Sequence, residues 1–168
     1  MTSAHSRNAD AHISKEERAQ VLRWLKESHR QFFAEVNGLS DQQWNWKPAP
    51  EQWSVGEIAE HIVLAEALLF NFVQKALVGP SNPHWEEETK SKTKFLVQVM
   101  PSGEGKAAAP QPLVPREGLT CAQVKDRFAS QRIGIVGFAG GTQAPLREFT
   151  IVHPFPVFGT LNAYQWLI

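Results

Sequence analysis

Residues 53–66, Trp-Ser-Val-Gly-Glu-Ile-Ala-Glu-His-Ile-Val-Leu-Ala-Glu, contain the clearest helix start in this chain. Ser54 is placed as the N-cap and Glu57 follows three residues later, so the two side chains can form a capping box. Apolar residues then recur at three- and four-residue spacing, which predicts a helix over 54–78 with one buried stripe. The stripe consists of Ile58, Ile62, Ala65, Leu69, Phe72 and Ala76.

Two further capping boxes indicate two further helices. Ser14 with Glu17 opens a helix expected over 14–37, and Thr120 with Gln123 opens one expected over 120–139. Each start is followed by apolar residues at helical spacing. A fourth helix is expected over 160–168. The sequence therefore predicts an all-α fold in which four helices bury their apolar faces against one another.

The remaining segments are expected to be irregular. Residues 1–12 are polar and predict a disordered tail, ahead of a single domain over 13–168. Residues 80–118 contain six prolines, and a structureless connection of this length is often a lid or binding loop. Within it, residues 94–100 are expected to lie extended.

His61 is the candidate ligand residue. It follows Ile58 by three positions, so we expect its ring to face the interior between helices 1, 2 and 4. An unpartnered buried polar group costs about 1–3 kcal/mol, so the ring needs a carboxylate, a backbone carbonyl, a water molecule or a metal ion. Glu57 lies on the same face and could orient the ring, whereas Glu60 and Glu66 are expected to meet solvent or neighbouring helices.

The composition excludes several classes of protein. The chain has 168 residues, enough for one sizeable core, and 17 basic residues balance 17 acidic ones. A net charge of zero gives no electrostatic reason to expect binding to nucleic acid or to an anionic membrane. The single cysteine, Cys121, fits a reducing compartment and is expected to be inert. No stretch is expected to reach the ~20 apolar residues of a membrane span, so a cytoplasmic location is expected.

Residues 44–61, Trp-Asn-Trp-Lys-Pro-Ala-Pro-Glu-Gln-Trp-Ser-Val-Gly-Glu-Ile-Ala-Glu-His, resemble the start of the second helix in the DinB-like (DinB/YfiT) superfamily. Residues 153–166 resemble the region just ahead of the family's last helix. The resemblance implies a four-helix bundle with a long crossover between helices 2 and 3. It also implies a divalent metal, zinc or nickel, held by three histidines, and in some members a thiol-dependent S-transferase or isomerase activity.

The sequence departs from the family at the metal site. Two of the three ligands belong to an H-x-x-x-H motif near the end of the fourth helix, and no such motif occurs here. Only His61 can be carried over, and the fourth helix is expected to be cut short at Ile168. Metal binding is therefore expected to be weak or absent unless His29, His153 or a second subunit supplies ligands.

Two functions from different classes remain open. The first is a metal-dependent, thiol S-transferase-like enzyme, in which the metal acts as a Lewis acid on a small thiol or another small substrate. The second is a non-enzymatic helical bundle that binds a small molecule or a partner protein. A short fourth helix would leave the stripes of helices 1 and 2 partly uncovered, which predicts a homodimer or an unstable monomer.

Overall fold

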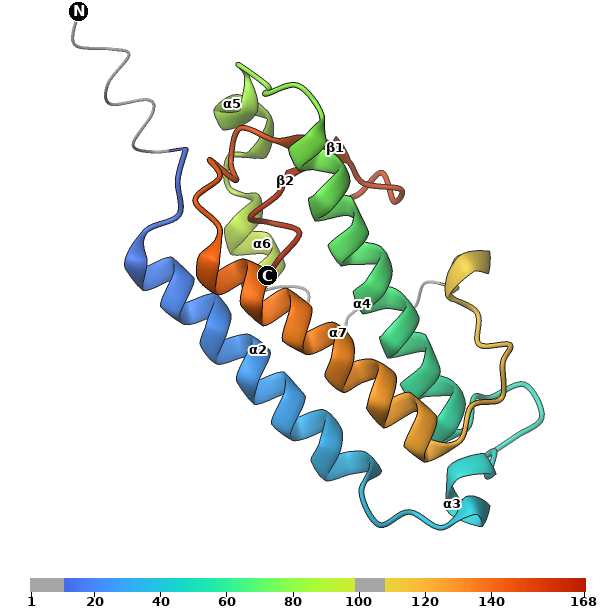
Figure 1. Ribbon diagram of the computed structural model, residues 1–168. Coiled ribbons are helices and arrows are strands. Elements are labelled where there is room, and N and C mark those ends of the chain that lie inside the picture. The colour runs from blue at the N-terminus through green and yellow to red at the C-terminus, as the bar shows by residue number, and fades with distance from the viewer. Residues whose placement is uncertain (1–10, 99–107) are drawn as a thin grey trace, which may run out of the picture. The chain divides into compact units, whose positions relative to one another are not determined.

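The computed structural model describes residues 11–98 and 108–168, and in these ranges the chain is mainly helical (Figure 1). The described residues divide into two compact units, unit 1 (residues 11–22, 69–98 and 139–168) and unit 2 (residues 23–68 and 108–138). The helices are α2 (Lys15–Val36), α3 (Asp41–Asn45), α4 (Val55–Val78), α5 (Trp85–Thr89), α6 (Lys92–Gln98), η2 (Gln111–Leu113, a 3₁₀ turn) and α7 (Cys121–Gly141). Two short strands, β1 (Thr150–Val152) and β2 (Thr160–Asn162), pair antiparallel.

The three predicted capping boxes are confirmed. At the start of α4, Ser54 N donates to Glu57 Oε2 at 2.8 Å and Glu57 N donates to Ser54 Oγ at 3.2 Å. The same reciprocal pair opens α2 and α7. A further capping box, Ser40 with Gln43, opens the short helix α3. These pairs satisfy backbone donors that a helix start leaves free. Because each pair involves residues only three positions apart, the helix starts could be predicted from the sequence.

Unit 2 is built on an aromatic core. Phe32 of α2 stacks on Phe128 of α7 with ring centroids 4.0 Å apart. Trp44 of α3 is 3 % exposed, and its Nε1 donates to the Leu119 carbonyl at 2.9 Å. The other buried members of this core are Val36, Ala59, Val63, Leu119 and Val124.

Unit 1 contains a segment that differs from the prediction. The helix expected over 160–168 is wrong, because residues 160–162 form strand β2 and turns follow. Ile151 lies opposite Leu161 in the two-stranded pairing, and Gly159, with φ of 59°, provides the positive-φ conformation in the loop between the strands. Pairing with the preceding strand β1 satisfies backbone groups that nine residues of isolated helix would satisfy poorly.

Two other expectations for irregular segments need correction. The extended segment expected over 94–100 is wrong for its described part, because Lys92–Gln98 form α6. The expected tail over 1–12 is wrong at its end, because Ala11 is fully buried and its carbonyl accepts from Arg147 N at 3.1 Å. Residues 1–10 lie outside the described residues.

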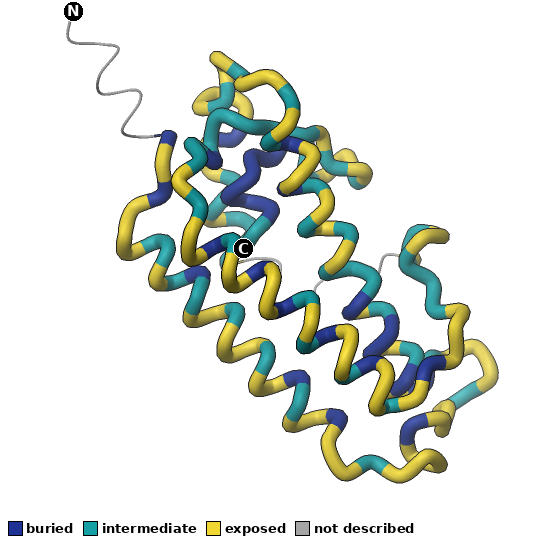
Figure 2. The backbone as a smooth tube through the Cα atoms, viewed as in Figure 1, coloured by how far each residue is buried: buried dark blue, intermediate teal, exposed yellow. Residues whose placement is uncertain are grey.

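The apolar stripe on α4 is largely uncovered. Ile58 is 46 % exposed, Ile62 38 % and Leu69 41 %, so the prediction that these side chains are buried is wrong. The buried apolar residues of α4 are instead Ala59, Val63 and Val73, together with Ala76, the one member of the predicted stripe that is buried. Much of α4 is accordingly coloured exposed or half-buried in Figure 2. The expectation that the stripe of this helix would stay partly uncovered is confirmed.

By length and composition alone, α4 could also cross a membrane, and only 17 % of its most apolar window is buried. The expectation that no stretch approaches the composition of a membrane span is therefore wrong. Core helices and signal sequences share this composition, so it does not by itself identify a membrane segment.

Gly56 is predicted to be indispensable for packing Trp44. A Cβ at position 56 would lie 2.5 Å from Trp44 Nε1, so Gly56→Ala must displace a buried indole from its hydrogen bond. Overpacking of this kind costs about 1–3 kcal/mol, measurable by urea unfolding. Gly134 of α7 offers a matched control, because a Cβ there would meet no described atom within 4 Å apart from its chain neighbours and the backbone of its own helix. Gly134→Ala should stabilise the chain by about 0.5–1 kcal/mol, and equal stability of the two variants would contradict the packing shown.

Candidate functional site

His61 lies on α4 with its ring against the segment that precedes α7. Its Nδ1 is 2.8 Å from the Leu113 carbonyl oxygen, and its ring centroid is 5.1 Å from that of Trp53. A carbonyl can only accept a hydrogen bond, so Nδ1 carries the proton. In a neutral ring, Nε2 then keeps its lone pair. The ring is half-buried and partnered, but by this segment rather than in the interior between helices.

Glu60, the neighbour of His61, is buried and holds the same segment. It is 2 % exposed, and its Oε1 accepts from the backbone N–H groups of Arg116 at 2.8 Å and Glu117 at 3.0 Å. The expectation that Glu60 meets solvent or a neighbouring helix is therefore wrong. Two consecutive residues of α4 bind the backbone between Leu113 and Glu117. Nothing in the sequence spacing indicates this contact, since its partners lie more than 50 positions away.

Glu57 does not orient the His61 ring. Its Oε2 is occupied by the capping box and its Oε1 forms an ion pair with Lys47 at 2.7 Å. The His61 ring is oriented instead by the Leu113 carbonyl, which accepts a hydrogen bond from it. A backbone carbonyl in this position fixes the tautomer of an imidazole as a carboxylate would.

The side chains of the described residues do not fit a complete metal centre. Among residues 11–98 and 108–168, no three His, Cys, Asp or Glu side chains lie together in a way that could hold an ion. His29 packs on aromatic rings in unit 2, 4.6 Å from the Phe33 centroid. Cys121 is half-buried, with its Sγ 3.4 Å from the Val36 carbonyl oxygen. Catalytic zinc normally has three protein ligands, and of the expected set only His61 could contribute one.

His153 belongs to an aromatic stack in unit 1. Its ring lies 4.8 Å from that of Trp166 at an interplanar angle of 9°, and 4.3 Å from that of Phe158. Its Nδ1 accepts from the backbone N–H of Phe155 at 2.9 Å. Burial lowers the pKa of His153 below its ordinary value, against the opposing effect of that hydrogen bond. The histidine is therefore a neutral member of a packed cluster near neutral pH.

An apolar groove of about 370 Å³ runs along unit 2. One wall is α4 with Ile58 and Ile62, the other is α2 with Phe32 and Val36, and Phe128 of α7 also lines it. Exposed apolar surface of this kind marks interaction sites in many proteins. The groove is the place in unit 2 where the uncovered stripe of α4 meets the apolar side of α2.

A buried ion pair lies beside this groove. Arg132, which also lines the groove, pairs with Glu66 and donates to Ser28 Oγ at 2.7 Å. Burial raises the pKa of Glu66 despite the nearby guanidinium. Glu66 Oε2 and Arg132 Nε are buried and have no hydrogen-bond partner within the described part of the chain. Glu66 thus meets a neighbouring helix, as expected, at a considerable desolvation cost.

Comparison with known proteins identifies the family. The model of the DinB superfamily matches residues 24–168, and the chain belongs to this superfamily. The chain is also similar to the uncharacterized protein YuaE of Bacillus subtilis (strain 168). The two are 27 % identical over 148 residues, which cover 85 % of this chain and 83 % of YuaE. No solved structure matches the chain significantly.

The stack around His153 predicts a pH dependence of stability. Because the folded-state pKa lies below the unfolded value of about 6.5, the unfolded chain binds more protons as the pH falls. Stability should therefore be full above about pH 6.5 and decline below it. His153→Phe should flatten this decline in urea unfolding between pH 7.5 and 5, whereas substitution of the exposed His84 by glutamine should not. An unchanged slope in His153→Phe would refute the neutral stack.

Proposed function

We propose that this chain binds a divalent metal, zinc or nickel, with His61 Nε2 as one ligand among several. The supporting observation is the hydrogen bond of His61 Nδ1 to the Leu113 carbonyl. Histidine ligands of metals usually donate their second ring nitrogen to a carbonyl or carboxylate in this way, which presents the other nitrogen's lone pair. The remaining ligands would come from groups other than the described side chains, such as a second copy of the chain or a small thiol.

A relation to thiol-dependent S-transferases is the enzymatic form of this proposal. It rests on family membership and on the general ability of a bound divalent metal to lower the pKa of a thiol. The described residues provide one ligand, so no reaction step is assigned to them. The role of His61 would be to hold and orient the ion, with Leu113 and Glu60 fixing the surrounding backbone.

Titration with Zn²⁺ tests the ligand assignment. We expect weak binding to the wild-type chain by isothermal titration calorimetry and its loss in His61→Ala. His29→Ala is the matched control, because it removes an imidazole from an aromatic cluster in the same unit and should leave the affinity unchanged. Stoichiometric Zn²⁺ retained by His61→Ala would refute the assignment.

The apolar groove of unit 2 supports a second candidate function, non-enzymatic binding of a partner. We propose that the occupant is a second copy of this chain, whose helix would complete a four-helix arrangement of the family's type around the groove. The charges on the nearby part of α4 support this choice. Glu57 pairs with Lys47, Glu66 pairs with Arg132 and Glu60 binds backbone N–H groups, so this part of α4 itself adds no unpaired carboxylate to the interface of two copies.

Sedimentation equilibrium tests the dimer. We expect the wild-type chain to dimerise and Ile62→Glu to be monomeric, because a carboxylate in the groove would be desolvated on association. Ile133→Glu is the control, since Ile133 is 76 % exposed on α7 and does not line the groove. A wild-type monomer that melts above ~65 °C, the upper end for ordinary domains, would contradict the proposal.

A further inference from the structure

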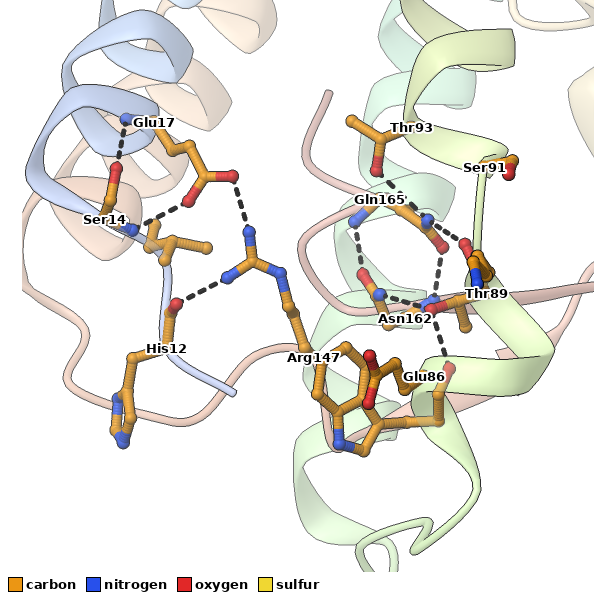
Figure 3. Close-up of a pocket in the computed structure, with 13 residues that line it drawn as sticks. His12, Ser14, Glu17, Glu86, Thr89, Ser91, Thr93, Arg147, Asn162 and Gln165 are labelled. Atoms are coloured by element: carbon orange, nitrogen blue, oxygen red, sulfur yellow. Dashed lines mark hydrogen bonds and ion pairs between the residues drawn. The ribbon is translucent and has the colours of Figure 1, made fainter. Parts of the chain in front are cut away.

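Unit 1 contains a pocket of about 500 Å³ that neither proposal above uses. This volume lies within the ~300–1,000 Å³ typical of small-molecule sites. Three separate parts of the chain line it, as Figure 3 shows for ten of the residues. The lining residues are His12, Ile13, Ser14 and Glu17, then Trp85, Glu86, Thr89, Lys90, Ser91 and Thr93, and finally Arg147, Asn162 and Gln165.

One wall of the pocket is a buried polar network. Asn162 and Gln165 exchange backbone and side-chain hydrogen bonds at 2.9 and 3.1 Å. Gln165 Nε2 also donates to the Thr89 carbonyl at 2.9 Å and to Thr93 Oγ1 at 3.2 Å. Asn162 Nδ2 donates to Thr89 Oγ1 at 3.0 Å. A buried network satisfied to this degree holds its side chains in one arrangement, so this wall has a fixed shape.

The opposite wall contains an ion pair between Arg147 and Glu17. Arg147 donates to Glu17 Oε1 and to the His12 carbonyl, and Figure 3 shows this group across the pocket from Asn162 and Gln165. Its guanidinium also lies 5.2 Å from the centre of the Tyr164 ring. Arg147 and Glu17 therefore cancel each other's charge and shape the pocket.

One residue that lines the pocket, Ser91, has a strained backbone conformation. Ser91, between α5 and α6, has a φ of 66° and is the one non-glycine residue with positive φ in the described part of the chain. Such a conformation persists only where surrounding structure enforces it, and it occurs preferentially at ligand-binding sites. Here it accompanies a turn that leaves Lys90 and Thr93 both lining the pocket.

The unpaired charged side chains that line the pocket indicate the charges of its ligand. Apart from the Glu17–Arg147 pair, the lining has one carboxylate, Glu86, and one ammonium, Lys90, and both residues are exposed. Neither forms an ion pair within residues 11–98 and 108–168. A strongly anionic ligand would meet no excess of positive charge. We propose that this pocket binds a small zwitterion of the amino-acid type, with Lys90 pairing its carboxylate, Glu86 its ammonium, and Trp85 contacting its apolar part.

Nuclear magnetic resonance titration with L-leucine tests this proposal. We expect saturable shifts of backbone amide signals in residues 85–93 and 162–165. N-acetyl-L-leucine lacks the ammonium and L-leucinamide lacks the carboxylate, so each should bind the wild-type chain about tenfold more weakly, as expected for the loss of one charged contact. Added salt should weaken L-leucine binding, because both contacts lie near the surface.

Matched variants locate the two contacts. Lys90→Gln and Glu86→Gln should each weaken L-leucine binding by about tenfold. Lys94→Gln and Glu87→Gln remove the same charges from exposed positions that do not line the pocket, so they should bind as the wild type does. His61→Ala should also bind normally, which separates this site from the proposed metal ligand.

Three results would overturn the proposal. They are the absence of saturable shifts, equal affinity for L-leucine and both analogues, and unchanged affinity in both pocket variants. The comparison of analogues uses only the wild-type chain and so does not depend on the folding of any variant.

Discussion

The close contact between Trp44 and Gly56 is the constraint on which the rest of unit 2 depends. The indole occupies the space that a side chain at position 56 would need, and its N–H binds the Leu119 carbonyl. One side chain thus joins α3, the first turn of α4 and Leu119, two residues before the start of α7. Because α4 is fixed at this end, Glu60 and His61 meet the backbone of residues 113–117.

The sequence predicted those features of the fold that depend on residues close together in the chain. A capping box needs only residues three positions apart, so the starts of α2, α4 and α7 were found correctly, and the motif around Trp44 and His61 indicated the right superfamily. The expected helix over 160–168 failed because its backbone pairs with residues 150–152, a contact that helical periodicity cannot reveal. The buried face of α4 was misassigned because that helix is apolar on more than one side, so periodicity did not single out the side that packs.

The site was predictable only in part for the same reason. The sequence indicated that His61 needs a partner, but it could not choose between a carboxylate and a carbonyl 52 residues away. A glutamate next to the apolar stripe reads as a surface residue in the sequence, and only the fold reveals that Glu60 is buried and accepts from two backbone N–H groups. The pocket of unit 1 combines three distant segments, so no motif could indicate it.

The composition of α4 also has a consequence for the newly made chain. In unit 2, Ala59 and Val63 are buried in a core that includes Phe128, which is synthesised 65 residues after Val63. At about 5–20 residues per second, that delay is about 3–13 s. During this interval α4, which is long and apolar, lacks Leu119, Val124 and Phe128, the part of its core that is made after it. Until then, the apolar residues of this segment would be accessible to chaperones.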